Sequence, residues 1–389
     1  NNTAVGTQAL RKNTTGVGNT AVGANAGDAN TTGTALTAIG VSALSANTTG
    51  DHNSAVGREC LLNNTTGENN TGMGVESLKS NTTASNNTAF GYFSLRANTT
   101  GTQNTAVGAN ALTSITTGNY CTAIGYNGLR NNTASNNTAC GYSALQDTTT
   151  GDENVAVGAF ALDANTTATH NTAVGHNSMT ATTTGGDNTA IGKTSLANNT
   201  TGLSNVAVGR SALASNTTAS NNTAVGSSAL GSSSTADNNT AVGYLSLNAN
   251  TTGASNTAVG KSALDANTTG DNNVAVGKDS MSANTTGRVC TAVGVNSLES
   301  NTSGADNTAI GIDCGKDCTT GDNNTFLGHD AGRSASPSGS ITTGSNNIVL
   351  GNNSVTNLFC ADTSISSSDS RDKTDVTSFN IGLAWINAL

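Results

Sequence analysis

The sequence predicts an all-β fold, a parallel β-solenoid (β-roll) of about 20 turns in which each turn is one 17-residue repeat. The glycine of a Thr-Ala-Val-Gly tetrapeptide returns with this period between Gly6 and Gly328, with one slip by a single position at Gly141. Each repeat carries β-branched residues bounded by Gly and Asn, which favour strands and turns. Residues 1–360 show no sustained helical period. A repeat this short and regular is one turn of a solenoid stacked on its neighbours.

The repeat reads Asn-Thr-Ala-Val-Gly-x-x-Ala-Leu-x-Ala-Asn-Thr-Thr-Gly-x-x, and its residues are numbered here as positions 1 to 17. Two extended segments are expected, Thr-Ala-Val and Ala-Leu-x-Ala. Alternation along a strand places the Thr at position 2 and the Val at position 4 on one face, and the Ala at position 3 on the other. We expect Val, or Ile as at Ile39, to lie inside the coil with the Leu of position 9. The Ala then faces outward, where it can pack against another chain.

A core of one Val and one Leu per turn is thin, and aromatic residues make up only 3% of the chain. Burial of so few apolar groups opposes a large loss of backbone entropy. A slender solenoid of this kind is therefore expected to assemble with copies of itself, and we predict a homotrimer.

The composition argues against several classes of function. The net charge is −9 and no basic patch suggests nucleic acid. No apolar run approaches the length of a membrane span, which needs roughly 18 residues or more. The four His are scattered over different turns without partner spacing, and the glycines are turn residues without the strand-to-helix context of a phosphate loop. No cofactor, metal or turnover enzyme is predicted.

The seven cysteines lie on different repeat positions. They are Cys60 and Cys314 at position 8, Cys140 at position 4, Cys121 and Cys290 at position 1, Cys318 at position 12, and Cys360 beyond the repeats. No two share a position on adjacent turns, so we expect free thiols that act as small apolar residues. A metal site built from Cys314 and Cys318 is the alternative, although it lacks a second pair of ligands.

The Asn-Thr-Thr segment at positions 12 to 14 predicts ladders of stacked side chains about 4.7 Å apart. We expect the Asn amides to bond along the stack and the Thr to cover a solvent-facing corner. Many of these segments are also Asn-x-Thr acceptor sequences, so glycosylation is an alternative if the chain is secreted. A flat Thr array that binds ice is a third hypothesis, but lapses such as Ile115 interrupt it.

The pattern changes near the C-terminus, where the spacing from Gly328 to the next matching glycine, Gly351, is longer than one repeat. The repeats then stop and the charge density rises. We therefore divide the chain into a repeat shaft, 1–360, and a C-terminal segment, 361–389. In the latter, one face of a predicted short helix carries residues at i, i+4 and i+8, namely Ile381, Trp385 and Leu389.

Residues 368–389 resemble the opening of the intramolecular chaperone domain that ends many phage tail fibres, tail spikes and endosialidases. The matching residues are Ser368-Asp369-x-Arg371-x-Lys373, Gly382-Leu383 and Ile386-x-x-Leu389. The resemblance implies a domain that drives trimerisation and then cuts itself, with Ser368 as nucleophile, Lys373 as base and Asp369 after the scissile bond. The chain stops where that family continues into the body of the domain. The repeats resemble those of tail-fibre-domain proteins and, more loosely, the heads of trimeric autotransporter adhesins.

The resemblance and the repeats together predict a structural fibre, the trimeric shaft of a viral or phage tail fibre assembled by a C-terminal chaperone. Its expected partners are its own copies and a glycan or protein receptor on the host cell surface. The expected location is the virion tail fibre or a cell surface. The alternatives are a cell-surface adhesin or extracellular filament, and an ice-binding solenoid.

Overall fold

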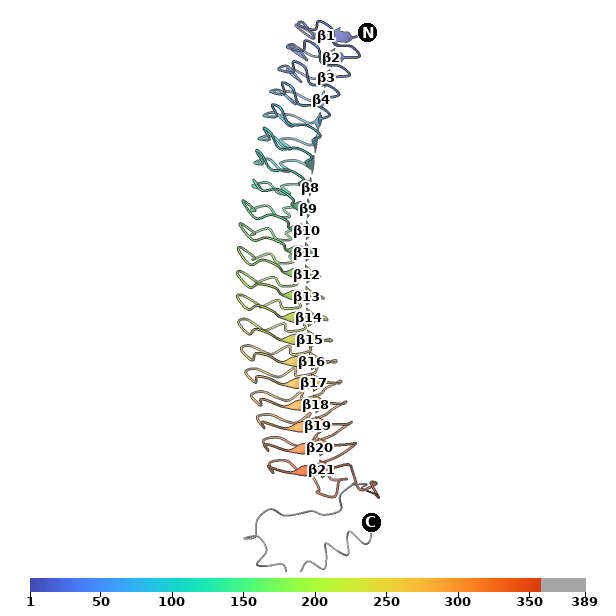
Figure 1. The fold of residues 1–389 in the computed structure, drawn as a ribbon, viewed down its shortest axis with the longest axis vertical. Coiled ribbons are helices and arrows are strands. Elements are labelled where there is room, and N and C mark those ends of the chain that lie inside the picture. Colours follow the sequence, from blue (N-terminus) through green and yellow to red (C-terminus); the bar gives the residue numbers. More distant parts are fainter. Residues whose placement is uncertain (358–389) are drawn as a thin grey trace, which may run out of the picture.

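The computed structural model describes residues 1–357, which form one continuous parallel β-solenoid without a helix (Figure 1). The coil is a gently curved rod with β1 at one end and β21 at the other, and one three-residue strand per turn. The fold class predicted from the repeat is confirmed. The strands are β1 Thr3–Val5, β2 Thr20–Val22, β3 Thr37–Ile39, β4 Ser54–Val56, β5 Thr71–Met73, β6 Thr88–Phe90, β7 Thr105–Val107, β8 Thr122–Ile124, β9 Thr138–Cys140, β10 Val155–Val157, β11 Thr172–Val174, β12 Thr189–Ile191, β13 Val206–Val208, β14 Thr223–Val225, β15 Thr240–Val242, β16 Thr257–Val259, β17 Val274–Val276, β18 Thr291–Val293, β19 Thr308–Ile310, β20 Thr325–Leu327 and β21 Ile348–Leu350.

Each strand pairs in parallel with the strand of the next turn, with equal repeat positions side by side, as in Thr3 with Thr20. The register is the same across the shortened turn, where Thr122 pairs with Thr138. It is also the same across the lengthened turn, where Thr325 pairs with Ile348. The ladder also continues outside the strands. The rise per turn is therefore one strand spacing, about 4.7–4.9 Å, which confirms one turn per repeat.

The predicted second extended segment, Ala-Leu-x-Ala, is wrong: it is a turn, and its Leu adopts a positive φ. Leu44 and Leu112 both have φ of 51°, in a region that bulky residues rarely adopt. Two features of the stack offset this strain. The Leu44 side chain is fully buried, and its N–H donates to the Cys60 carbonyl of the next turn at 3.0 Å. A coil that closes within so short a repeat needs sharp changes of chain direction. The positive φ of the Leu provides one of them, although the residue alone would avoid this conformation.

The glycine at position 5 explains why the tetrapeptide is so regular. Gly23 has φ of 137°, and a Cβ built there would lie 2.5 Å from the Gly40 carbonyl oxygen of the next turn. Both the backbone conformation and the close stacking therefore exclude a side chain at this corner.

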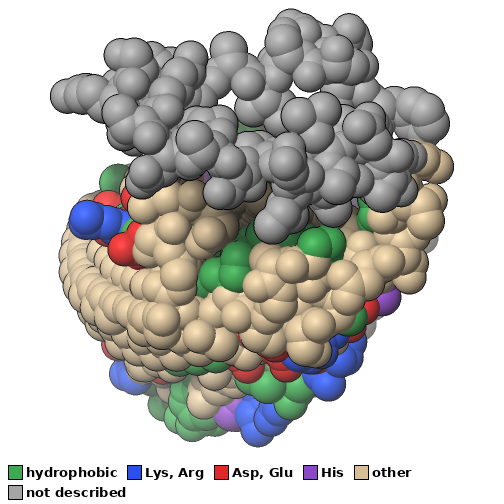
Figure 2. Space-filling model, turned by 90° about the horizontal axis from the view of Figure 1, so that it is seen from below, with side chains coloured by type: hydrophobic (Ala, Val, Ile, Leu, Met, Phe, Trp, Pro, Cys, Tyr) green, Lys and Arg blue, Asp and Glu red, His purple; other side chains and the backbone are tan. Residues whose placement is uncertain are grey.

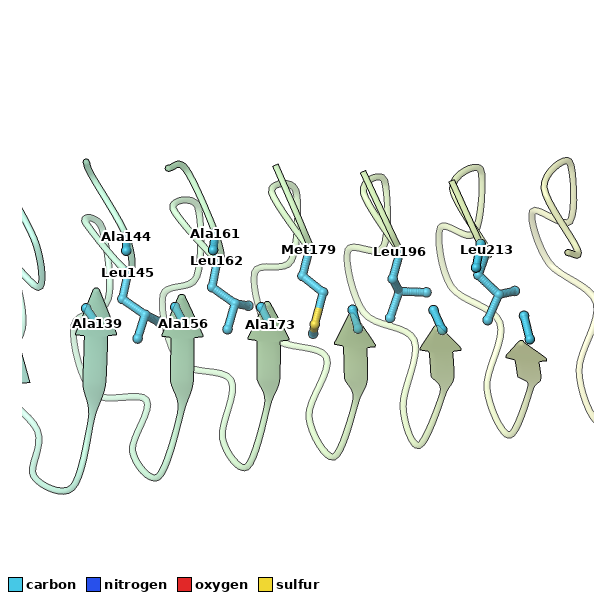
Figure 3. Packing of buried hydrophobic residues seen from close by; sticks show 14 of the residues in the cluster. Ala139, Ala144, Leu145, Ala156, Ala161, Leu162, Ala173, Met179, Leu196 and Leu213 are labelled. Atoms are coloured by element: carbon cyan, nitrogen blue, oxygen red, sulfur yellow. The ribbon is translucent and has the colours of Figure 1, made fainter. Parts of the chain in front are cut away.

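The prediction of which strand face points inward is also wrong. The Ala of position 3 lies inside and the Val of position 4 faces outward: Ala173 is fully buried, whereas Val174 is half-buried and Ile191 is exposed. Figure 3 shows the alanines of successive strands opposite Leu145, Leu162 and their equivalents, which confirms the inward Leu of position 9. The coil is so narrow that only a methyl group fits on the strand opposite the Leu.

The interior is half polar, as two Asn ladders run along the coil beside the Ala and Leu. At position 12, Asn47 donates from Nδ2 to Asn30 Oδ1 at 3.0 Å and to the Gly50 carbonyl at 3.0 Å. At position 1, Asn53 Oδ1 accepts the Asn70 N–H at 3.0 Å. The predicted Asn ladder is confirmed at position 12, and nearly all of its amides find partners without water.

The Thr of position 13 also serves the stack, since Thr31 Oγ1 donates to the Thr48 carbonyl of the next turn at 2.9 Å. Because this hydroxyl donates its proton to a backbone carbonyl, it cannot donate the same proton to ice. This weakens the hypothesis of an ice-binding array at this segment. The neighbouring Asn side chains, such as Asn47 and Asn64, are fully buried. The folded shaft therefore does not offer these Asn-x-Thr sequences for glycosylation.

Candidate assembly interface

The outward face of the 21 strands is an uninterrupted, uncharged surface, called here the sheet face. It presents the residues of positions 2 and 4, mostly Thr and Val or Ile, and no strand contains a charged residue. The side chains at position 4 are half-buried or exposed: Val174 is half-buried, Ile39 is 40% exposed and Ile124 is 44% exposed. A long exposed surface without charge, rich in Val and Ile, is a candidate for contact with another molecule.

The sheet face is large enough for a stable protein interface. Twenty-one strands at a spacing of about 4.8 Å give a length of about 95 Å, and three residues give a width of about 10 Å. The product, about 950 Å², exceeds the roughly 800 Å² that each partner contributes to a standard interface.

Sequence reasoning missed this face because it assigned the branched side chains to the core. A signal was present in the size of the residues at positions 3 and 8. Gly72 replaces the usual Ala on β5, and a Cβ built there would lie 2.4 Å from Sγ of Cys60, which replaces a smaller Ala. The larger Cys at position 8 thus accompanies the smaller Gly at position 3. Such compensation in size indicates that both positions face the interior of the coil.

The six cysteines in residues 1–357 are free thiols, as predicted. Five are buried, and burial raises the pKa of Cys60 to about 12 and those of Cys290 and Cys314 to about 11. Such thiols stay protonated and inert at neutral pH. Cys140 differs, because it stands at position 4 of β9 and is exposed on the sheet face.

A cluster of ion pairs lies beside the coil near β4 to β6. Lys79 Nζ lies 2.7 Å from Glu59 Oε2, and Arg96 Nε lies 2.8 Å from Glu76 Oε2. Arg96 also lies over the Phe93 ring, 4.5 Å from its centroid. Hydrogen bonding to Lys79 lowers the pKa of Glu59. For Glu76, partial burial acts against ionisation, but hydrogen bonds from Arg96 and Lys79 outweigh it and lower its pKa.

One group in residues 1–357 has the side chains of a cation site: Asp313, His329 and Asp330. Two cations already compensate its carboxylates. Arg333 lies 2.5 Å from Asp330 and 3.5 Å from Asp313, and Lys316 lies 3.5 Å from Asp313. The group is an ion-pair network rather than an open ligand set.

The predicted cleavage residues Ser368, Asp369 and Lys373 lie outside the described residues, as does the predicted C-terminal helix. Both remain predictions from the sequence. Among residues 1–357, no helix is long and apolar enough to span a membrane. No protein-family model and no curated protein matches the chain.

Proposed function

We propose that the chain is the shaft of a viral or phage tail fibre, in which three copies pack through their sheet faces into a stiff rod. The observation that carries this proposal is the uncharged sheet face, which is too long and too apolar to suit a lone chain in water. A partner must match the period of the repeat, and a second copy of the chain does so at every turn.

The interior of the coil supports the same conclusion. Each turn buries mainly one Leu, two small residues and two Asn, so few apolar groups compensate for the ordering of a whole turn of backbone. Covering the Val and Ile of the sheet face would bury a second apolar layer along the whole rod.

The C-terminal motif supports the tail-fibre class, because the chaperone domain it resembles assembles β-rich shafts into trimers. The rod would hold a receptor-binding end away from the virion, toward a glycan or protein of the host surface. An extracellular adhesin would use the same solenoid. A virion-attachment domain upstream would support the fibre, and a secretion signal with a surface anchor would support the adhesin.

The mass of the particle in solution tests the assembly. Sedimentation and light scattering should give three times the chain mass of 38.3 kDa without denaturant and the single-chain mass in denaturant. A native particle of single-chain mass would contradict the proposal, and thermal hysteresis from such a monomer would favour ice binding by the sheet face instead.

Cys140 supplies a local probe of the interface. In a Cys360→Ser background, mild oxidation should join copies through Cys140, because it is the one described thiol exposed on the sheet face. The matched control Cys140→Ser should remain uncrosslinked while keeping its mass. Efficient crosslinking of the control would place the contact elsewhere.

A further inference from the structure

We infer that the copies pack parallel and in register, with the acidic edge of one sheet face against the basic edge of the next. The inference rests on the proposed assembly through the sheet face and adds its direction and partner residues. The direction follows from the way in which charges are divided between the two edges of the strands.

The edge that follows the strands, at position 6, is basic. It carries no carboxylate in any repeat, and between β12 and β17 it carries Lys193, Arg210, Lys261 and Lys278, all of them exposed. Lys278 pairs with the adjacent Asp279. Within residues 1–357 the other three cations make no ion pair, so their charges are free to meet a partner. Figure 2, which looks along the rod from below, shows blue side chains beside apolar ones at the lower margin of the view, and further blue and red side chains on its left side.

The edge that precedes the strands, at positions 16 and 17, is acidic, with nine carboxylates and Arg288 as the single Lys or Arg. Asp237 and Asp271 each use one oxygen to accept a backbone N–H of the turn before, at 2.7 and 2.6 Å. These bonds hold the side chains in place and leave the second oxygen unused. Asp187 is exposed and lies 3.5 Å from His170.

The separation of acidic and basic residues onto opposite edges, combined with the symmetry of the assembly, decides whether the copies run parallel or antiparallel. In copies related by an axis along the rod, the leading edge of one sheet face meets the trailing edge of its neighbour, so unlike charges approach. In antiparallel copies packed face to face, acidic edges meet acidic edges, and like charges repel. The arrangement of charges therefore selects the parallel assembly.

A closed rotation about an axis along the rod brings equal turns of all copies to the same height, so the copies lie in register. Asp187 and Lys193 stand on opposite edges of the single strand β12, and Asp271 and Lys278 do so at β17. Parallel copies in register bring Asp187 of one chain to the height of Lys193 of the next. A shift of one turn, about 4.8 Å, would break these two matches but bring Asp187 to Arg210 and Asp237 to Lys261, so the register follows from the closed rotation and not from the number of charge pairs.

Charge reversal tests the pairing. Asp187→Lys and Lys193→Glu should each raise the dissociation constant of the assembly at least threefold at low salt. The double reversal should recover most of the loss, because the pair is then merely inverted. The control Arg130→Glu, at an exposed position 10 away from the sheet face, should leave assembly unchanged. Losses that simply add in the double variant, or that persist undiminished in 0.5 M salt, would overturn the pairing.

Crosslinking tests the direction separately. In a Cys140→Ser, Cys360→Ser background, Val22→Cys on β2 should crosslink to Val22→Cys of another copy. A mixture with Leu327→Cys on β20 should give no Val22→Cys to Leu327→Cys product. Mixed crosslinks in a normal assembly would overturn the parallel arrangement and leave the proposed function intact. A wild-type chain that stays a monomer would overturn both.

Discussion

The Phe326 ring fills the space that a side chain at Gly332 would need. A Cβ built on Gly332 would lie 2.3 Å from Cε1 of Phe326, and one built on Gly315 would lie 2.7 Å from its Cδ2. Phe326 stands at position 3, where most turns have Ala, and both glycines stand at position 9, where most turns have Leu. The volume of the coil is thus kept while the large residue changes sides.

This exchange predicts a double-mutant cycle. Gly332→Leu should clash with the ring and destabilise the last turns by about 1–3 kcal/mol. Phe326→Ala should leave a cavity and cost about 3–5 kcal/mol. The double variant restores the usual Ala and Leu at one contact and should lose less than the sum of the two. Hydrogen exchange of β19 to β21 measures these losses, and strict additivity would show that the two residues do not share one space.

A second prediction concerns a break in the position-12 ladder. Asn216 Oδ1 is buried without a hydrogen-bond partner because Ser233 stands where the next Asn belongs, and Ser233 Oγ is also unpaired. Ser233→Asn should donate to Asn216 and accept from Asn250, which raises the free energy of unfolding by about 1 kcal/mol. Thermal unfolding measures the gain. The neighbouring exposed control, Ser232→Asn, should change nothing, and an equal gain there would refute the ladder explanation.

The inward and outward strand positions predict opposite phenotypes for neighbouring residues. Ala173→Asp places an unpaired charge in the closed coil and should unfold the surrounding turns, at a cost of several kcal/mol. Val174→Asp places the charge on the sheet face, so the β-signal in circular dichroism should persist while the native mass falls to one chain. Loss of the fold in Val174→Asp, with Ala173→Asp tolerated, would reverse the assignment.

The ion-pair cluster predicts a loss of stability in acid. The folded-state pKa values of Glu59 and Glu76 lie below their ordinary value of 4.5. Their contribution is therefore present above that ordinary value and is lost as the pH falls through the lower folded values. The melting temperature of the wild type should fall over that acid range, and the melting temperature of Glu76→Gln should fall less. Equal acid slopes for the two proteins would mean that the cluster does not contribute.

The C-terminal resemblance predicts a single cleavage in a chain that includes the rest of the chaperone domain. Ser368→Ala removes the nucleophile, and Lys373→Ala removes the base that takes its proton. Each should stop release of the fragment that begins at Asp369 and still allow trimers to form. Intact-mass measurement of the three proteins decides this. If the wild type trimerises without being cut, Ser368 is a linker residue.

The sequence by itself determined the period, the strand at positions 2 to 4, the inward Leu of position 9, the Asn ladder of position 12 and the parallel register. All of these repeat at the same spacing, and stacking of equal positions follows from the period alone. Even the slip at Gly141 left the register intact, since the shortened turn still returns Thr138 to the strand beside Thr122.

Only the tertiary structure decided which strand face is inside and that the second segment is a turn. Alternation separates Ala173 from Val174 but does not say which of them faces the core. That choice depends on the distance between the strand and the Leu of the opposite turn, which is set by how one repeat closes into a coil. The gap there admits a methyl group and no more, so the larger Val is left outside.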